Sequence, residues 1–298
     1  MKKKPKYKIA VLIHSLEWKS AKSSLSLGNG LYFHQVIKHP VRKLYEAECR
    51  DNNLDDGDPY LYETCLTIHD WEGGIYTGGF PRDPYSQISQ LINVLATYYH
   101  RAVDMVRIFI SSDNFKTFIS TEEVDFAGAQ CEFLLVDAFE LRDGDFMTIK
   151  KIWANVCFFW MAKQSQSRVI NAFTHLYYSW NMHYLEQTAI HISIVLEILF
   201  SPHSKDELSH QIAFNACQFL AATKAQKQEI YKKVKKYYNI RSKIIHGDWS
   251  DRKDELIIPE FFRMTCTLLI KIISNKRLAS MFEDNAKRRQ YFDDLIFG

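Results

Sequence analysis

The sequence lacks the cysteine and apolar patterns that define several large classes of protein. Its six cysteines are scattered, with no CxxC pair and no histidine at zinc-site spacing, so neither a zinc site nor a disulfide framework is indicated. The apolar run at residues 9–13 ends at His14 and is too short for a signal peptide or a membrane span. We therefore expect free thiols in a reducing cytosol and a cytoplasmic protein without a membrane partner.

The usual signatures of phosphate and metal chemistry are also missing. There is no GxxxxGK[ST] phosphate loop, no HExxH motif, and no D…ExK grouping on paired strands in the first half. We therefore predict that the chain uses no metal and no cofactor. One rival interpretation places an enzyme in the first half, with the second half serving only to dimerise it. The acidic residues available to such an enzyme are Asp58, Glu63, Asp125, Glu132 and Asp137.

Glycine is scarce in the second half, where Gly247 is the only one between Gly144 and Gly298. Helical periodicity fills this half, and we predict an all-α helical bundle over residues 146–298. The expected helices cover residues 146–163, 168–183, 185–200, 206–222, 225–246 and 259–274.

The first half, residues 1–145, has a different sequence pattern, with strands as well as a helix expected. Strand-like runs lie at 61–71, 104–113 and 130–141, and an amphipathic helix is expected over 86–103. We therefore predict an α+β N-terminal domain, which senses a trigger or controls substrate access. Its Gly/Pro-rich segment 72–84 is the expected recognising surface.

Acidic residues are nearly absent from segment 224–247, although the whole chain has a net charge of only +3. Glu229 alone opposes Lys224, Lys227, Lys232, Lys233, Lys235, Lys236, Arg241 and Lys243. Such a helix attracts phosphates, because binding them releases counterions. We predict RNA contacts at Lys232, Lys236 and Lys243. A solvated surface helix remains the plainer alternative for a lysine run.

An arginine interrupts the apolar stripe of the same helix. Ile230, Val234, Tyr237, Arg241 and Ile244 step by 4, 3, 4 and 3 residues, which places them on one helix face. A buried guanidinium needs a carboxylate, a polar cleft or an interface as its surroundings. One interpretation is therefore a structural Arg–Glu bridge inside the bundle.

Two glutamates and a histidine complete the candidate site. Glu197 and Glu207, on neighbouring predicted helices, are the possible partners of Arg241. His246 follows Arg241 by five residues, about 140° round an ideal helix. Gly247 is a natural C′ residue, and local unwinding at that point would bring the arginine and the histidine to one cleft. A simple helix cap is the plainer explanation for His246.

Three segments together resemble successive helices of the ApeA-like HEPN family. They are residues 195–200 (VLEILF, the family's alEaLf), 207–209 (ELS, its ELs helix start) and 238–247 (YNIRSKIIHG, its lYklRSkivHG helix end). Both their order and their spacing match the family. The resemblance covers about residues 165–275, a little over a third of the chain.

The resemblance implies an all-α HEPN bundle that forms a homodimer through the helix at 225–246. Two copies of the R-x4-H motif then line one composite cleft, and Arg241 and His246 are the catalytic pair. Ser242 falls on the polar position that often follows the arginine. Many members are metal-independent endoribonucleases of toxin–antitoxin, abortive-infection and other antiphage systems. Others do not catalyse, so an RNA- or protein-binding module is the alternative function.

The residue types support a concrete mechanism for RNA cleavage. RNA supplies its own nucleophile, the 2′-hydroxyl; His246 takes that proton or gives one to the 5′-oxygen. Arg241 holds the phosphate and stabilises its extra charge. The expected products carry a 2′,3′-cyclic phosphate and a 5′-hydroxyl. Structured RNA such as tRNA is the expected substrate, under the control of a phage-derived trigger or a regulatory partner.

Supporting roles are assigned to Ser242, Glu197, Glu207 and Tyr238. Tyr237, Tyr238 and Trp249 are candidates for stacking on unpaired bases. Packing in the aromatic core and in loops is the favoured alternative for these three, above all for Tyr237.

Overall fold

The computed structural model describes most of the chain, in two compact units. The described residues are 7–13, 16–28, 30–51, 64–71, 84–100, 105–111, 115–116, 120–125, 139–163, 167–182, 184–201, 208–248 and 256–297. The first unit holds the described residues up to 125 together with 139–154, and the second holds those from 155 onward. The division falls inside helix α3 (Asp143–Lys163). The expected boundary at residues 145 and 146 lies in the first turn of that helix.

The first unit is built on an antiparallel sheet with the strand order β3-β4-β5-β1-β6-β7. The strands are β1 (Tyr7–Ile13), β3 (Ser24–Gly28), β4 (Leu31–Gln35), β5 (Thr64–Trp71), β6 (Met105–Ser111) and β7 (Ser120–Asp125). Residues 9–13 of the central strand β1 are all 0% exposed. This short apolar run therefore forms a strand whose residues are buried on both faces of the sheet.

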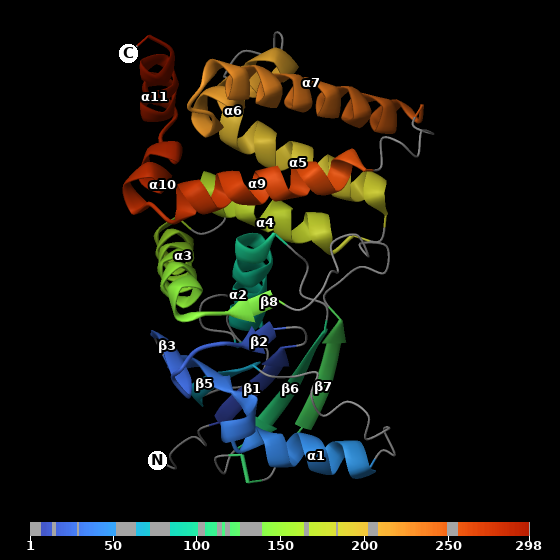
Figure 1. Ribbon diagram of the computed structural model, residues 1–298, viewed down its shortest axis with the longest axis vertical. Helices are drawn as coiled ribbons and strands as arrows, with labels where there is room; N and C mark the ends of the chain where they lie inside the picture. The colour runs from blue at the N-terminus through green and yellow to red at the C-terminus, as the bar shows by residue number, and fades with distance from the viewer. Residues whose placement is uncertain are drawn as a thin grey trace. The chain divides into compact units, whose positions relative to one another are not determined.

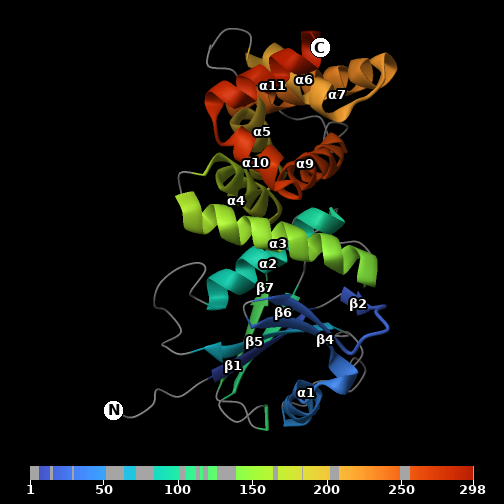
Figure 2. The same ribbon diagram turned by 90° about the vertical axis from the view of Figure 1, so that its left-hand side faces the viewer.

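Helices cover the sheet of the first unit. Helix α1 (Val41–Asp51) follows the 3-10 turn η1 (Val36–Lys38), and α2 (Pro84–Tyr99) confirms the helix expected from residue 86. Figure 2 shows α1 and α2 on opposite sides of the sheet. Ala10 and Leu12 of β1 share a buried cluster with Val41 and Leu44 of α1, because alternate residues of a strand point to opposite faces.

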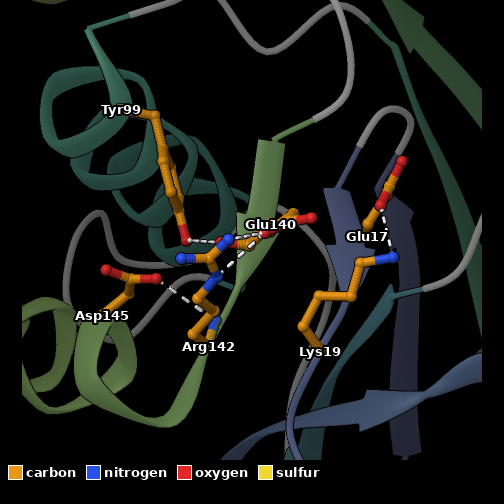
Figure 3. Close-up of polar contacts among 6 residues, drawn as sticks. All are labelled: Glu17, Lys19, Tyr99, Glu140, Arg142 and Asp145. Carbon is orange, nitrogen blue, oxygen red and sulfur yellow. Dashed lines mark hydrogen bonds and ion pairs between the residues drawn. The ribbon is translucent and has the colours of Figure 1, made fainter.

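A polar cluster connects the start of α3 to the rest of the first unit (Figure 3). Strand β8 (Phe139–Leu141) pairs in parallel with β2 (Leu16–Trp18). Tyr99 donates a hydrogen bond of 3.0 Å to the carbonyl of Glu140, and Arg142 Nε donates one of 2.8 Å to the Glu140 carboxylate. The backbone N–H of Arg142 donates to Asp145 in the first turn of α3. These bonds fix where the helix begins, at the RDGD segment.

The second unit is helical, so the predicted order of an α+β region followed by an all-α region is confirmed. Its helices after α3 are α4 (Arg168–Trp180), α5 (Leu185–Phe200), α6 (Leu208–Leu220), α7 (Lys224–His246), α9 (Ile257–Ile273), α10 (Lys276–Phe282) and α11 (Asn285–Phe297). The five expected helices between residues 168 and 274 are all present. Helices α10 and α11 were not expected from the sequence.

Helix α5 is the central element of the second unit. It packs against α4, α6, α7 and α9, and these helices surround it in Figure 1. It is apolar on most of its circumference, as expected for a helix buried on several sides. Its own Phe200 and the facing Phe173 and Phe261 are no more than 2% exposed. The bundle core therefore forms around α5, beside the helix that carries the basic residues.

Several residues singled out from the sequence lie outside the described residues. These are Glu207, Trp249, segment 72–83, and four of the five first-half acids, Asp58, Glu63, Glu132 and Asp137. Cys65, Cys157, Cys217 and Cys266 are free thiols and buried. In the part of the chain that the structure describes, no helix is both long and apolar enough to cross a membrane.

Candidate functional site

Helix α7 is capped firmly at both ends. At its start, the Thr223 hydroxyl accepts from the Gln226 N–H and the Gln226 side chain accepts from the Thr223 N–H, which forms a capping box. At its end, Gly247 adopts φ 76° and ψ 12°, the left-handed conformation that glycine adopts without strain. The Asp248 N–H donates to the Lys243 carbonyl over 2.9 Å. The helix is therefore regular through His246, and the local unwinding proposed at its end does not occur.

The inner face of α7 is aromatic. Tyr237 is fully buried, stacks on Phe261 with ring centroids 3.9 Å apart, and donates its hydroxyl proton to the Ala189 carbonyl. Tyr238 is only 6% exposed. Core packing, the favoured interpretation, therefore describes both tyrosines, and neither ring is available to stack on a base.

Arg241 forms the ion pair that the structural interpretation required. Its Nη2 lies 3.2 Å from Oε1 of Glu197 on α5, and the two side chains are 32% and 25% exposed. The arginine is therefore held by a carboxylate and still reaches the surface. A guanidinium has five N–H donors, and one ion pair leaves several of them for another acceptor.

A third polar group adjoins this pair. The Tyr238 hydroxyl, Arg241 Nε and Glu197 Oε1 are all buried and lack a well-aligned hydrogen bond. Burial, and then the charge of Glu197, raise the pKa of the Tyr238 hydroxyl, while Arg241 lowers it. The phenol therefore stays neutral beside the ion pair. Tyr238, Arg241 and Glu197 therefore form a small polar cluster at the edge of the aromatic core.

The outer face of α7 carries a row of exposed polar and basic side chains that was not expected from the sequence. Five residues follow one another at steps of 4, 3, 4 and 3, the same spacing as in the apolar stripe: Lys232, Lys236, Asn239, Lys243 and His246. All five are exposed. We call this set the basic stripe. All three predicted phosphate contacts belong to it, and His246 ends it. The signal was present in the sequence, since polar residues follow helical spacing as apolar ones do.

Three other lysines of α7 have specific neighbours. Lys233 forms ion pairs of 2.8 Å with Glu229 and 2.7 Å with Glu260, and Lys235 donates a 2.9 Å hydrogen bond to Ser209 on α6. Lys227 donates to the side chain of Gln218. Positive charge is therefore partly neutralised on the flanks of the helix.

The structure brings Arg241 and Glu197 together but keeps Arg241 and His246 apart. On a regular helix, five residues place the two side chains about 140° apart round the axis. Arg241 lies on the α5 side and His246 on the basic stripe. Ser242 is exposed between them. Within one chain, the described residues therefore form an anchored arginine and a separate stripe with a histidine at its end.

Comparisons with known proteins leave the site to be interpreted from its own chemistry. No protein family, no curated protein and no solved structure matches this chain. Among the residues described here, no three His, Cys, Asp or Glu side chains gather as a metal-binding cluster.

Proposed function

We propose that this chain is a metal-independent endoribonuclease of the ApeA-like HEPN type, an effector of toxin or antiphage systems that cleaves RNA at a cleft formed by two copies. The observation that carries the proposal is the exposed basic stripe ending in His246, five residues after an arginine that retains surface exposure. Three exposed lysines on one helix face attract the phosphates of a nucleic-acid backbone, because binding them releases counterions.

A second copy of the chain is needed to form a cleft that contains both an arginine and a histidine. Because Arg241 and His246 point in different directions from one helix, a cleft that contains both needs the α7 of another copy. A two-fold interface presents the same surface from each partner, so the arginine of one copy can meet the histidine of the other. There His246 moves the proton of the 2′-hydroxyl or of the 5′-oxygen, and Arg241 stabilises the charged phosphate.

A non-catalytic RNA- or protein-binding module is the second candidate function. The ion pair between Arg241 and Glu197 favours it, since a guanidinium engaged inside its own bundle has an architectural role without any chemistry. The same basic stripe would then bind RNA without cleaving it. The two candidates agree on binding and differ only on cleavage.

The test is cleavage of total RNA by the purified chain in excess EDTA, with Arg241→Ala and His246→Ala beside the wild type. Cleavage by the wild type alone, leaving 2′,3′-cyclic phosphate ends, is the expected result. Cleavage that survives both substitutions would place the chemistry elsewhere. Tight RNA binding without cleavage by any of the three proteins would favour the binding module.

A further inference from the structure

A cavity of about 370 Å³ lies in the second unit between α6 and α11, with the C-terminal end of α5 at its edge. This volume is near the lower end of the range of small-molecule sites, about 300–1,000 Å³. None of the residues that line it belongs to α7. The cavity is therefore separate from Arg241, His246 and the basic stripe, and its role does not depend on the proposed ribonuclease activity.

A buried arginine lies at one side of this cavity. Arg288 of α11 is 4% exposed, and its guanidinium donates to the carbonyls of Leu199 at 2.8 Å and Ser201 at 3.2 Å. A weaker contact of 3.5 Å joins its Nη2 to Asn285 Oδ1. Desolvation by burial, and then the charge of Arg168, lower the pKa of Arg288 to about 10. The environment is therefore one that penalises the cation.

No carboxylate offsets this charge among the described residues, because Arg288 makes no ion pair there. The carbonyl end of α5 stabilises it in part, as the negative end of a helix dipole does. A buried cation without a counter-ion is costly. The neighbouring Arg289 is exposed and also lines the cavity, against one lining acid, Asp293. The net charge of the residues that line the cavity therefore favours an anionic ligand.

The other side of the cavity is aromatic. His210 and Phe214 of α6 both line it, with their rings tilted by only 25° and their centroids 6.2 Å apart. The His210 ring is held by the Tyr231 hydroxyl, 2.7 Å from its Nδ1. Phe214 is only half-buried, and Phe292 of α11 lines the cavity as well. Planar rings stack on such surfaces whatever their detailed substitution.

We propose that this cavity binds a nucleoside monophosphate, with its phosphate at Arg288 and Arg289 and its base against His210 and Phe214. The phosphate would take over the long contact that Asn285 makes with Arg288 and would supply the missing counter-ion. The cavity volume of about 370 Å³ is large enough for one nucleotide. Charge-assisted hydrogen bonds to the phosphate provide affinity. Stacking of the base on the rings makes the site prefer a nucleotide over inorganic phosphate.

The test is isothermal titration calorimetry of the full chain with AMP, adenosine and inorganic phosphate. We expect one AMP to bind per chain. Adenosine and phosphate should each bind at least about tenfold more weakly, since each makes half of the contacts. Arg289→Gln and Phe214→Leu each weaken AMP binding by about tenfold, and both leave the α5 cap made by Arg288 intact. Arg263→Gln, at an exposed position of α9 outside the cavity, is the matched control and binds as the wild type does.

Three results would overturn the proposal. One is no binding of AMP, or of the guanosine, cytidine and uridine monophosphates, at about 1 mM. Another is inorganic phosphate binding as tightly as AMP, which would reduce the site to an ion contact. The third is AMP affinity unchanged by both Arg289→Gln and Phe214→Leu, with thermal melts showing that the variants are folded.

Discussion

Arg241 of α7 and Glu197 of α5 form an ion pair across two helices of the bundle, with Nη2 3.2 Å from Oε1. The pair sits at the edge of the core rather than inside it, since both side chains keep a quarter to a third of their surface exposed. A permanent cation on an apolar helix face is thereby accommodated without full desolvation. The arginine is held in place and remains accessible.

Glu197→Gln tests how much this pair contributes to the fold. Partly exposed ion pairs contribute little, so we expect the free energy of unfolding to fall by no more than about 1 kcal/mol. Urea denaturation of the variant and the wild type measures it. A loss of several kcal/mol would show instead that the pair is a buried structural element, which would favour the non-catalytic interpretation.

Neutralising the basic stripe should weaken RNA binding in a salt-dependent way. Each of Lys232→Gln, Lys236→Gln and Lys243→Gln should lower affinity for all RNA sequences alike. Each should also reduce the slope of log K against log salt by about one unit. Fluorescence anisotropy with a labelled RNA at several salt concentrations measures both quantities. Arg277→Gln, an exposed position on α10, serves as the control, and an equal effect there would remove the special role of α7.

Gly247→Ala should destabilise the second unit through the backbone alone. Gly247 has φ 76°, and a Cβ at this position would meet no atom within 4 Å. The cost is therefore that of holding an alanine in the left-handed region, about 1 kcal/mol. Gly247→Asn should cost less, because asparagine tolerates this conformation better. Equal stability of wild type and alanine variant in urea would argue that the helix ends differently in solution.

The bundle could be predicted from sequence because its helices have strong one-sided periodicity. Helix α5 was expected at residues 185–200, the bounds it has, and α7 differs by one residue at its start. Helix α11 was missed because its buried positions include Arg288 as well as Phe292. A buried arginine interrupts the apolar periodicity of the helix, and its place is explained by the carbonyls at the end of α5 that accept its hydrogen bonds.

The candidate site was predictable in its parts and not in its geometry. The helical spacing of the apolar stripe predicted that Arg241 lies on the inner face of α7. Glu197, on a neighbouring predicted helix, was expected as a possible partner. Nothing in the sequence, however, decides between Glu197 and Glu207, because the choice depends on how α5 and α7 cross. The regular end of α7 also depends on bonds around Gly247 that close the helix instead of unwinding it. The separation of Arg241 from His246 follows from that detail.

A histidine pair should make stability depend on pH. The Nδ1 atoms of His175 on α4 and His191 on α5 lie 3.0 Å apart. Burial lowers the pKa of both rings, and the charge of His175 lowers that of His191 further. The unfolded chain therefore binds protons more readily, so stability present above pH 6.5, the ordinary pKa, is lost as pH falls below it. The double variant His175→Gln/His191→Gln should flatten this dependence in urea titrations between about pH 5 and 8, and parallel curves would contradict the assignment.

The central claim, a site shared between two copies, is tested most directly by mixing variants. Arg241→Ala and His246→Ala, carrying different tags, are co-expressed and the mixed dimer is purified for RNA cleavage in EDTA. If the arginine of one copy acts with the histidine of the other, each variant alone is inactive and the mixed dimer cleaves. An inactive mixed dimer beside an active wild type would contradict the account, because it would place both groups in the same chain.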